Sequence, residues 1–141
     1  MSDQPSASGL SPSQRVTLSA RLASEGDGTS ERLAGLVDRF DGVVEASALS
    51  AADDEHDPEG ATVGFERAQL SALIDEARHH LDAVERARQR LTAGDYGVCE
   101  GCGRDIGFDR LMAHPVAHTC VDCAAGVTPV LRPRINRPGS G

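Results

Sequence analysis

The chain has 141 residues, of which 39% are hydrophobic and only 3% aromatic, and its formal net charge is −8. This length suits one domain, or a small domain with extensions, and excludes a multidomain enzyme. With one Tyr, three Phe and no Trp, any core must be built from Leu, Val, Ile and Ala, which bury less area than aromatic rings. A thick globular core is therefore not expected. The acidic balance also disfavours a dedicated nucleic-acid-binding protein.

The composition also indicates where the chain works. All 14 basic residues are Arg, which together with the abundant Ala and Gly suggests a GC-rich genome. No apolar run approaches the roughly 18 residues of a membrane span, and the N-terminus has neither a basic flank nor an apolar stretch for export. We therefore expect a cytoplasmic protein without membrane contact, where paired cysteines hold a metal more often than they form disulfides.

The N-terminal part is expected to hold a tail and one short helix. Residues 1–10 are rich in Ser, Pro and Gly, which predicts a disordered tail. Ser11 and Pro12 are typical of a helix start, and Gly26-Asp27-Gly28 is expected to end that helix. Residues 11–29 are thus predicted to form an N-terminal helix and a linker.

Residues 30–94 carry the spacing of two helices that form an antiparallel coiled-coil hairpin. The second arm repeats every seven residues and ends at Gly94, while five carboxylates and a Pro within residues 53–59 predict an acidic tip loop over 52–60. The apolar positions are Leu33, Leu36, Val37, Phe40, Val43 and Val44 in the first arm and Leu70, Ile74, Ala77, Leu81, Val84 and Leu91 in the second.

The predicted arms differ in length. At about 1.5 Å per residue, the second arm would span about 50 Å and the first about 33 Å. We expect the N-terminal helix and the cysteine-containing segment to cover the overhang and form a base. The predicted fold is thus mainly α, a coiled-coil hairpin projecting from a small base. A three-helix bundle remains the alternative.

Residues 95–124 are predicted to form a four-cysteine zinc finger. Cys99, Cys102, Cys120 and Cys123 form two C-x2-C pairs separated by seventeen residues, a spacing that lets two turns meet around one tetrahedral ion. Four thiolates suit one structural Zn(II) and leave no position for a reacting water. A redox dithiol or a disulfide pair is the alternative. His114 and His118 are possible substitute ligands that we interpret as surface residues.

The charge of the zinc finger argues against binding of DNA. Residues 95–123 contain five acidic and two basic side chains, and a zinc ion with four thiolates adds a formal −2, so the finger would repel phosphate. Residues 125–141 are predicted to be a flexible Pro/Arg tail. Its three arginines could contact a nucleic acid or an acidic surface weakly, or be solvated.

The segment DYGVCEGCGRDIGFDRLMAHPVAHTCVDC resembles the zinc finger of the DksA/TraR family of bacterial transcription regulators. The matching features are the aromatic-Gly pair before the first Cys, the Ile-Gly after the first pair, and the final C-[IV]-D-C. The resemblance implies a non-enzymatic regulator of transcription initiation that binds RNA polymerase and inserts the hairpin tip through the secondary channel. Asp57, Glu59 and Ala61 would be the tip residues that approach the polymerase.

The chain departs from the family pattern at two places. Gly60 stands where family members typically carry a second tip aspartate. Members that respond to the alarmone ppGpp use basic side chains at five positions that hold no Lys or Arg here, so we predict independence of ppGpp. By alignment, the corresponding positions include Glu76, His80, Ala83, His114 and Ala124.

Other function classes remain open. A zinc-stapled interaction adaptor, in which the coiled coil pairs with another protein or with itself, is the main alternative to a regulator, which we expect to be a monomer. A sequence-specific DNA-binding protein is disfavoured by charge. An enzyme is the least expected class, because no Gly-rich phosphate loop, nucleophile elbow or HExxH motif occurs. His79 and His80 are adjacent on a helix and therefore poorly placed to share a metal ion.

Overall fold

The computed structural model describes residues 9–51 and 58–126, and within them the fold is mainly α, as predicted. It contains α1 (Pro12–Ala51), α2 (Pro58–Ala93), α3 (Phe108–Ala113) and α4 (Val121–Ala124). In this part of the chain, β pairing is limited to one antiparallel bridge between Val98 and Asp105. None of the described helices is long and apolar enough to cross a membrane.

The chain divides into two compact units, which we call the base unit and the hairpin unit. The base unit consists of residues 1–25 and 83–141, and the hairpin unit of residues 26–82. The two long helices pass through both units.

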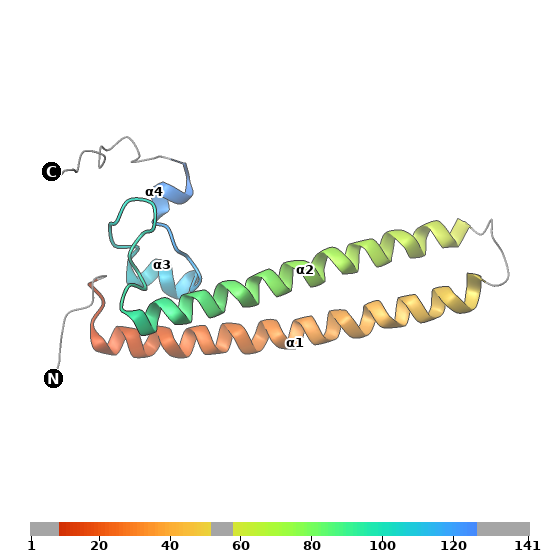
Figure 1. Ribbon diagram of the computed structural model, residues 1–141, viewed down its shortest axis with the longest axis horizontal. Coiled ribbons are helices and arrows are strands. Elements are labelled where there is room, and N and C mark those ends of the chain that lie inside the picture. Colours follow the sequence, from red (N-terminus) through yellow and green to blue (C-terminus); the bar gives the residue numbers. More distant parts are fainter. Residues whose placement is uncertain (1–8, 52–57, 127–141) are drawn as a thin grey trace. The chain divides into compact units, whose positions relative to one another are not determined.

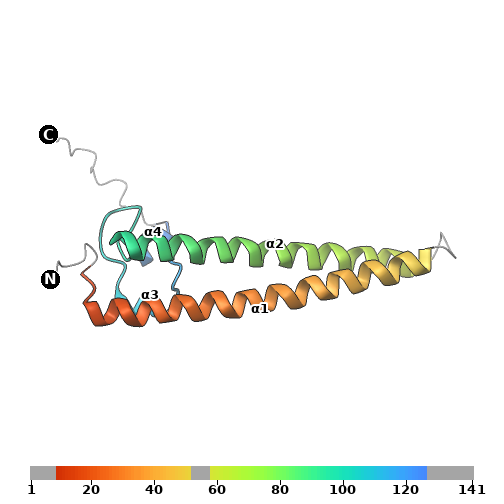
Figure 2. The same cartoon turned by 60° about the horizontal axis from the view of Figure 1, so that its bottom comes forward.

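In the hairpin unit, α1 and α2 lie side by side and run in opposite directions (Figures 1 and 2). The predicted heptad positions of the second arm supply the core, where Leu70, Ile74 and Ala77 are buried. From α1, Leu36 is the buried hydrophobic residue of this core, whereas Val44 is 36% exposed. The partly buried residues that pack against this cluster are Leu33, Val37, Phe40 and Val43. The predicted hairpin is therefore confirmed, with a thin core.

The predicted break at Gly26-Asp27-Gly28 is wrong, because α1 is one helix of 40 residues. Two helical glycines cost about 2 kcal/mol together, and the buried face continues through them. Leu22 on one side and Thr29 on the other are both buried, and their spacing of seven keeps them on one face. The predicted overhang disappears with the break, since α2 has 36 residues.

Two other predicted boundaries shift. The N-terminal tail was expected to include Leu10, but Leu10 is 6% exposed and belongs to the base core. Helix α2 begins at Pro58, because Pro is favoured at the first helical position, so residues 58–60 are helical rather than part of the tip loop. Residues 1–8, 52–57 and 127–141 lie outside the described residues, as do the predictions that fall on them.

The base unit has its own core, built from the first turns of α1, the end of α2 and the cysteine-containing segment. Tyr96 is at its centre, 2% exposed, and its hydroxyl donates a 2.7 Å hydrogen bond to the carbonyl oxygen of Pro115. Burial raises the pKa of Tyr96 to about 12. The buried residues of this core are Leu10, Leu18, Leu22, Val84, Ala87, Tyr96, Cys99, Ile106, Leu111 and Cys120.

We expect Gly35→Ala to stabilise the hairpin unit. A Cβ at this helical position meets no atom within 4 Å, so the variant gains helix propensity worth about 0.5–1 kcal/mol. Urea unfolding followed by far-UV circular dichroism measures the change. Gly101→Ala is the contrasting control, because its Cβ would lie 3.0 Å from Cys123 Sγ. A loss of stability in Gly35→Ala would contradict the assigned helix.

Candidate metal centre

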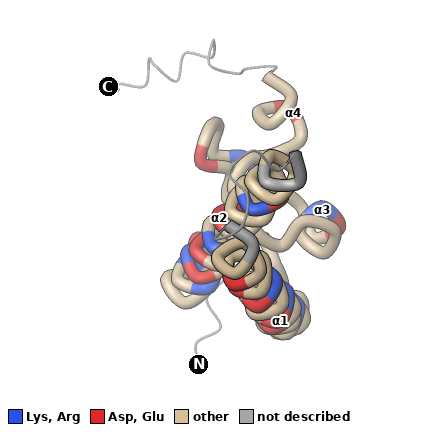
Figure 3. The backbone as a smooth tube through the Cα atoms, turned by 90° about the vertical axis from the view of Figure 1, so that its right-hand side faces the viewer, with Lys and Arg blue, Asp and Glu red and all other residues tan. Residues whose placement is uncertain are grey.

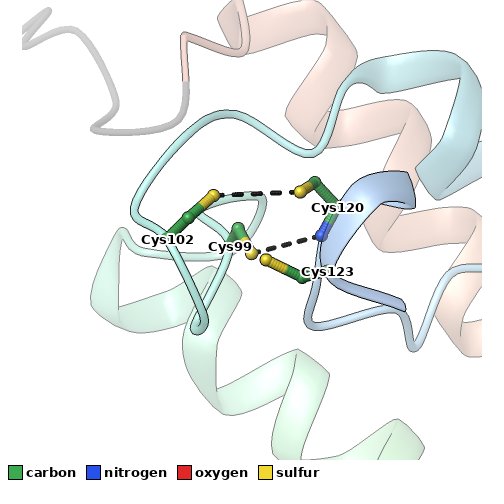
Figure 4. A group of neighbouring side chains, drawn as sticks. All are labelled: Cys99, Cys102, Cys120 and Cys123. Atoms are coloured by element: carbon green, nitrogen blue, oxygen red, sulfur yellow. Dashed lines mark hydrogen bonds between the residues drawn. The ribbon is translucent and has the colours of Figure 1, made fainter. Parts of the chain in front are cut away.

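The structure brings the four cysteines of the base unit together (Figure 4). Cys99 and Cys102 lie in the loop after α2, Cys120 is the N-cap residue of α4, and Cys123 lies within α4. Their four sulfur atoms all lie within 4.8 Å of one another, and the Cys102 and Cys120 sulfurs are 3.8 Å apart. Two segments about twenty residues apart thus converge on one point.

Backbone hydrogen bonds shape the first cysteine turn. Cys99 N–H donates to the carbonyl of Arg104 at 2.8 Å, and Gly103 N–H donates to the carbonyl of Cys99 at 2.8 Å. Gly103 has φ of +80°, a left-handed conformation that glycine adopts without strain. Gly101 leaves room for the second cysteine pair, since a Cβ there would approach Cys123 Sγ to 3.0 Å.

Cys99 Sγ accepts two backbone hydrogen bonds, one from Gly101 N–H at 3.3 Å and one from Cys120 N–H at 3.2 Å. Burial raises the pKa of the Cys99 thiol, but hydrogen bonds from backbone amides outweigh it and lower the pKa to about 6. The backbone amide and guanidinium of Arg104 lower the pKa of Cys102. Hydrogen bonding from the polypeptide thus lowers the pKa of both cysteines of the first pair.

Cys123 has the opposite tendency. Burial, assisted by the neighbouring thiols, raises its pKa to about 12. Four thiolates at these distances repel one another, and a cation among them would offset that repulsion without protonating the thiols. The cluster therefore suits a metal ion more than a set of free thiols.

The geometry fits zinc in particular. A tetrahedral ion with Zn–S bonds of about 2.3 Å has ligand sulfurs about 3.8 Å apart, and the Cys102–Cys120 separation is 3.8 Å. Four sulfur ligands fill the tetrahedron, which is typical of structural rather than catalytic zinc. In the described residues this is the sole group of three or more His, Cys, Asp or Glu side chains close enough to hold a metal ion.

The two histidines of the spacer stand apart from this cluster. His114 and His118 are both exposed, as predicted. His118 Nδ1 lies 3.4 Å from a carboxylate oxygen of Glu100, whose other oxygen is 3.5 Å from Arg90 Nη1. His79 is exposed, and His80 is partly exposed.

Three arginines hold the segments around the metal centre by donating to carbonyl oxygens, a role that sequence reasoning missed. Arg90 donates to Val98 at 2.9 Å, Arg21 to Met112 at 3.0 Å, and Arg110 to Thr119 at 3.1 Å. Such pairings join residues up to 91 positions apart, and no sequence spacing reveals them. Tyr96, the sole Tyr of the chain, was noted only as part of the aromatic-Gly pair, and its place in the base core was missed.

The three predicted tip residues lie in the hairpin unit, apart from the metal centre in sequence. Asp57 lies outside the described residues. Glu59 and Ala61 lie in the first turn of α2, and Ala61 is exposed.

Comparison with known proteins identifies this module. Residues 94–129 match the family described as "Prokaryotic dksA/traR C4-type zinc finger". The fold resembles the structure of transcription factor DksA2 from Pseudomonas aeruginosa, with a TM-score of 0.70 over 88% of this chain and 90% of that one, at 22% identity. The chain thus combines a helical hairpin with a module that matches a C4-type zinc finger.

Curated proteins match parts of this chain. General stress protein 16O of Bacillus subtilis (strain 168) is 35% identical over 83 residues, which cover 59% of this chain and 51% of that protein. The RNA polymerase-binding transcription factor DksA of Escherichia coli (strain K12) is 39% identical over 49 residues, 35% of this chain and 32% of that protein. The chain thus spans about half the length, or less, of these relatives. Residues 94–129 are thus similar to the zinc finger of the DksA/TraR family, and the fold of the chain resembles that of DksA2.

We expect Cys123→Ser to lose zinc and most of the stability of the base unit. Metal binding contributes on the order of 10 kcal/mol to the folding of such a module. Metal analysis of the purified, reduced protein and thermal unfolding measure the two effects. His118→Ala is the matched control and should retain zinc. Zinc loss in His118→Ala, or full zinc content in Cys123→Ser, would contradict the four-cysteine ligand set.

Proposed function

We propose that this chain is a non-enzymatic transcription regulator that binds RNA polymerase in the cytoplasm as a monomer. Its hairpin end enters the polymerase secondary channel and modulates transcription initiation. The observation that carries the proposal is the DksA/TraR-type finger at the end of α2, an antiparallel helix whose other end carries the acidic segment. One structural zinc ion, held by the four cysteines, would stabilise the base unit.

The distribution of charge supports insertion into a basic cavity. The hairpin unit has fourteen acidic and four basic side chains, a net charge of −10, whereas the base unit has eight acidic and ten basic ones, a net of +2. Five of the acidic residues are concentrated within residues 53–59. A concentrated negative charge is attracted to a basic-lined channel that contains Mg(II) and is repelled by nucleic acid.

The proposed tip residues act in different ways. Asp57 would bring a carboxylate toward the polymerase catalytic centre, and Glu59 would supply a second carboxylate next to Gly60. Ala61, exposed in the first turn of α2, presents a small side chain that permits close approach of the partner.

We further propose that the chain acts without ppGpp. A groove of about 330 Å³ in the base unit lies along the end of α2, and Asp95 and Glu100 line it together with Arg86 and Arg90. A tetraphosphate-like ligand would meet two carboxylates beside the two guanidiniums. Arg90 is moreover engaged by the carbonyl of Val98 at 2.9 Å. The remaining lining residues are Ala83, Ala87, Gln89, Ala93, Val116 and His118.

The tip mechanism is tested with Asp57→Asn. We expect the variant to bind core RNA polymerase but to lose most of its effect on transcription initiation at saturating concentration, because one carboxylate near the catalytic centre is neutralised. Asp27→Asn removes the same charge from an exposed position at the other end of the same unit and should act like the wild type. Equal effects of wild type and Asp57→Asn would contradict the tip assignment.

The ppGpp proposal is tested on the same purified components. We expect saturating ppGpp to change the affinity of the chain for polymerase by less than twofold. The change in transcription that the chain itself causes should also shift by less than twofold. The measurement is a titration with and without ppGpp, corrected for the effect of ppGpp on polymerase alone. An affinity gain of tenfold would show that a phosphate site had been overlooked.

A further inference from the structure

The metal centre carries negative charge that its surroundings have to offset. A zinc ion with four thiolate ligands has a formal charge of −2, and residues 95–123 add five acidic side chains against two arginines, Arg104 and Arg110. Groups that donate hydrogen bonds or positive charge to the sulfurs favour the deprotonated, metal-binding form. The cysteines of the first pair differ in the donors that reach them.

Backbone amides reach Cys99, whereas an arginine side chain reaches Cys102. Cys99 Sγ accepts hydrogen bonds from the N–H groups of Gly101 and Cys120. Cys102 accepts hydrogen bonds from the backbone amide and from the guanidinium of Arg104. Hydrogen bonding to Cys102 and the negative charge of its thiolate in turn raise the pKa of Arg104. The contact is therefore a pairing of a guanidinium with a thiolate.

The local fold holds Arg104 beside both cysteine pairs. Gly103, with φ of +80°, turns the chain, and the carbonyl of Arg104 accepts a 2.8 Å hydrogen bond from Cys99 N–H. On the side of the second pair, Arg104 Nη2 lies 3.8 Å from Asp122 Oδ2. Arg104 also lines a cleft of about 210 Å³ together with Cys120 and Asp122. Its backbone is thus fixed to the first pair while its side chain extends to the second.

Asp122 increases the need for a positive charge at this place. It is the acidic residue of α4 (Figure 3) and lies between Cys120 and Cys123 in the sequence. A carboxylate near thiolates disfavours their charged form, and the guanidinium of Arg104 offsets it. Both side chains of the Arg104–Asp122 pair are more than half exposed, so the pair itself adds little stability.

The two other arginines near the centre are engaged elsewhere. Arg90 donates to the carbonyl of Val98 at 2.9 Å and lies 3.5 Å from a carboxylate oxygen of Glu100. Arg110 donates to the carbonyl of Thr119 at 3.1 Å. Among these three arginines, Arg104 is the one whose guanidinium reaches a cysteine sulfur.

We propose that Arg104 compensates the negative charge of the metal centre and thereby raises its affinity for Zn(II). A guanidinium stays charged at any physiological pH, so it offsets the charges of Cys102 and Asp122 permanently. This role rests on the zinc ion proposed above and is independent of polymerase binding. An exposed side chain outside the ligand set would thus help to retain the metal.

The test is a charge series at position 104. Arg104→Lys keeps the positive charge, Arg104→Gln removes it, and Arg104→Glu reverses it. The dissociation constant for Zn(II) is measured on the full-length, reduced chain at one pH, by competition with a chromophoric chelator. We expect it to rise about tenfold in Arg104→Gln, more in Arg104→Glu, and less than threefold in Arg104→Lys.

Arg88→Gln is the matched control. Arg88 is an exposed arginine on α2 in the base unit, so this variant loses the same charge away from the cysteines. Its dissociation constant for Zn(II) should stay within twofold of the wild type. Circular dichroism of the zinc-loaded chains should show the helix content of the wild type in all four variants.

The outcomes separate this role from the proposed zinc ion. A wild-type chain that binds no zinc overturns both. A wild type that binds zinc, with Arg104→Gln within twofold of it, overturns the role of Arg104 alone. Equal losses in the Lys, Gln and Glu variants would show that the shape of the arginine matters rather than its charge, and would also overturn the proposal.

Discussion

The base unit depends on the meeting of two cysteine pairs. Cys99 and Cys120 are both buried in its core, and Cys99 Sγ accepts a hydrogen bond from Cys120 N–H at 3.2 Å. Around this contact the chain supplies one buried Tyr and several aliphatic side chains, too little apolar area for a stable module of this size without a further constraint. A metal ion at the cluster supplies that constraint, and it holds the loop and α4 against the ends of the long helices.

The hairpin unit is held together by few buried side chains. Four buried side chains and a few half-buried ones form its core, and most of the surface of the two helices is left to solvent. Glycines occur every seven residues on α1, at Gly28, Gly35 and Gly42, each at a cost in helix stability. A thin unit with a net charge of −10 suits entry into a narrow basic channel, for which a thicker bundle would be too wide.

Much of this could be predicted from the sequence. The heptad spacing of residues 70–91 predicted the second arm, because a/d periodicity is set by helix geometry alone. The spacing of the cysteines predicted their convergence, because two C-x2-C turns can meet around one tetrahedral ion. The predicted break at Gly26-Asp27-Gly28 was wrong because the helix-breaking tendency of the glycines was given more weight than the continuity of the buried face. Leu18, Leu22, Thr29 and Leu36 are separated by four, seven and seven residues, which keeps them on one side of a helix through the glycines. That continuity was a readable signal.

Other features could not be predicted. The arginines that donate to the carbonyls of Met112, Val98 and Thr119 act through tertiary geometry, for which spacing carries no signal. The burial of Leu10 likewise depends on the base core, which a Ser- and Gly-rich flank conceals. Exposure of Phe65 was also hidden, because a Phe in a helical pattern is more often a core residue.

The most direct test of the account uses this chain, labelled at one of its ends and bound to RNA polymerase. In the catalytic centre of the polymerase, Fe(II) replaces Mg(II). Hydroxyl radicals generated there cleave only the nearby backbone. The account predicts cleavage confined to residues around the acidic segment 53–59, with the zinc-finger base uncut. Cleavage in the base unit, or none in the hairpin of a complex shown to be saturated, would contradict insertion of the hairpin end.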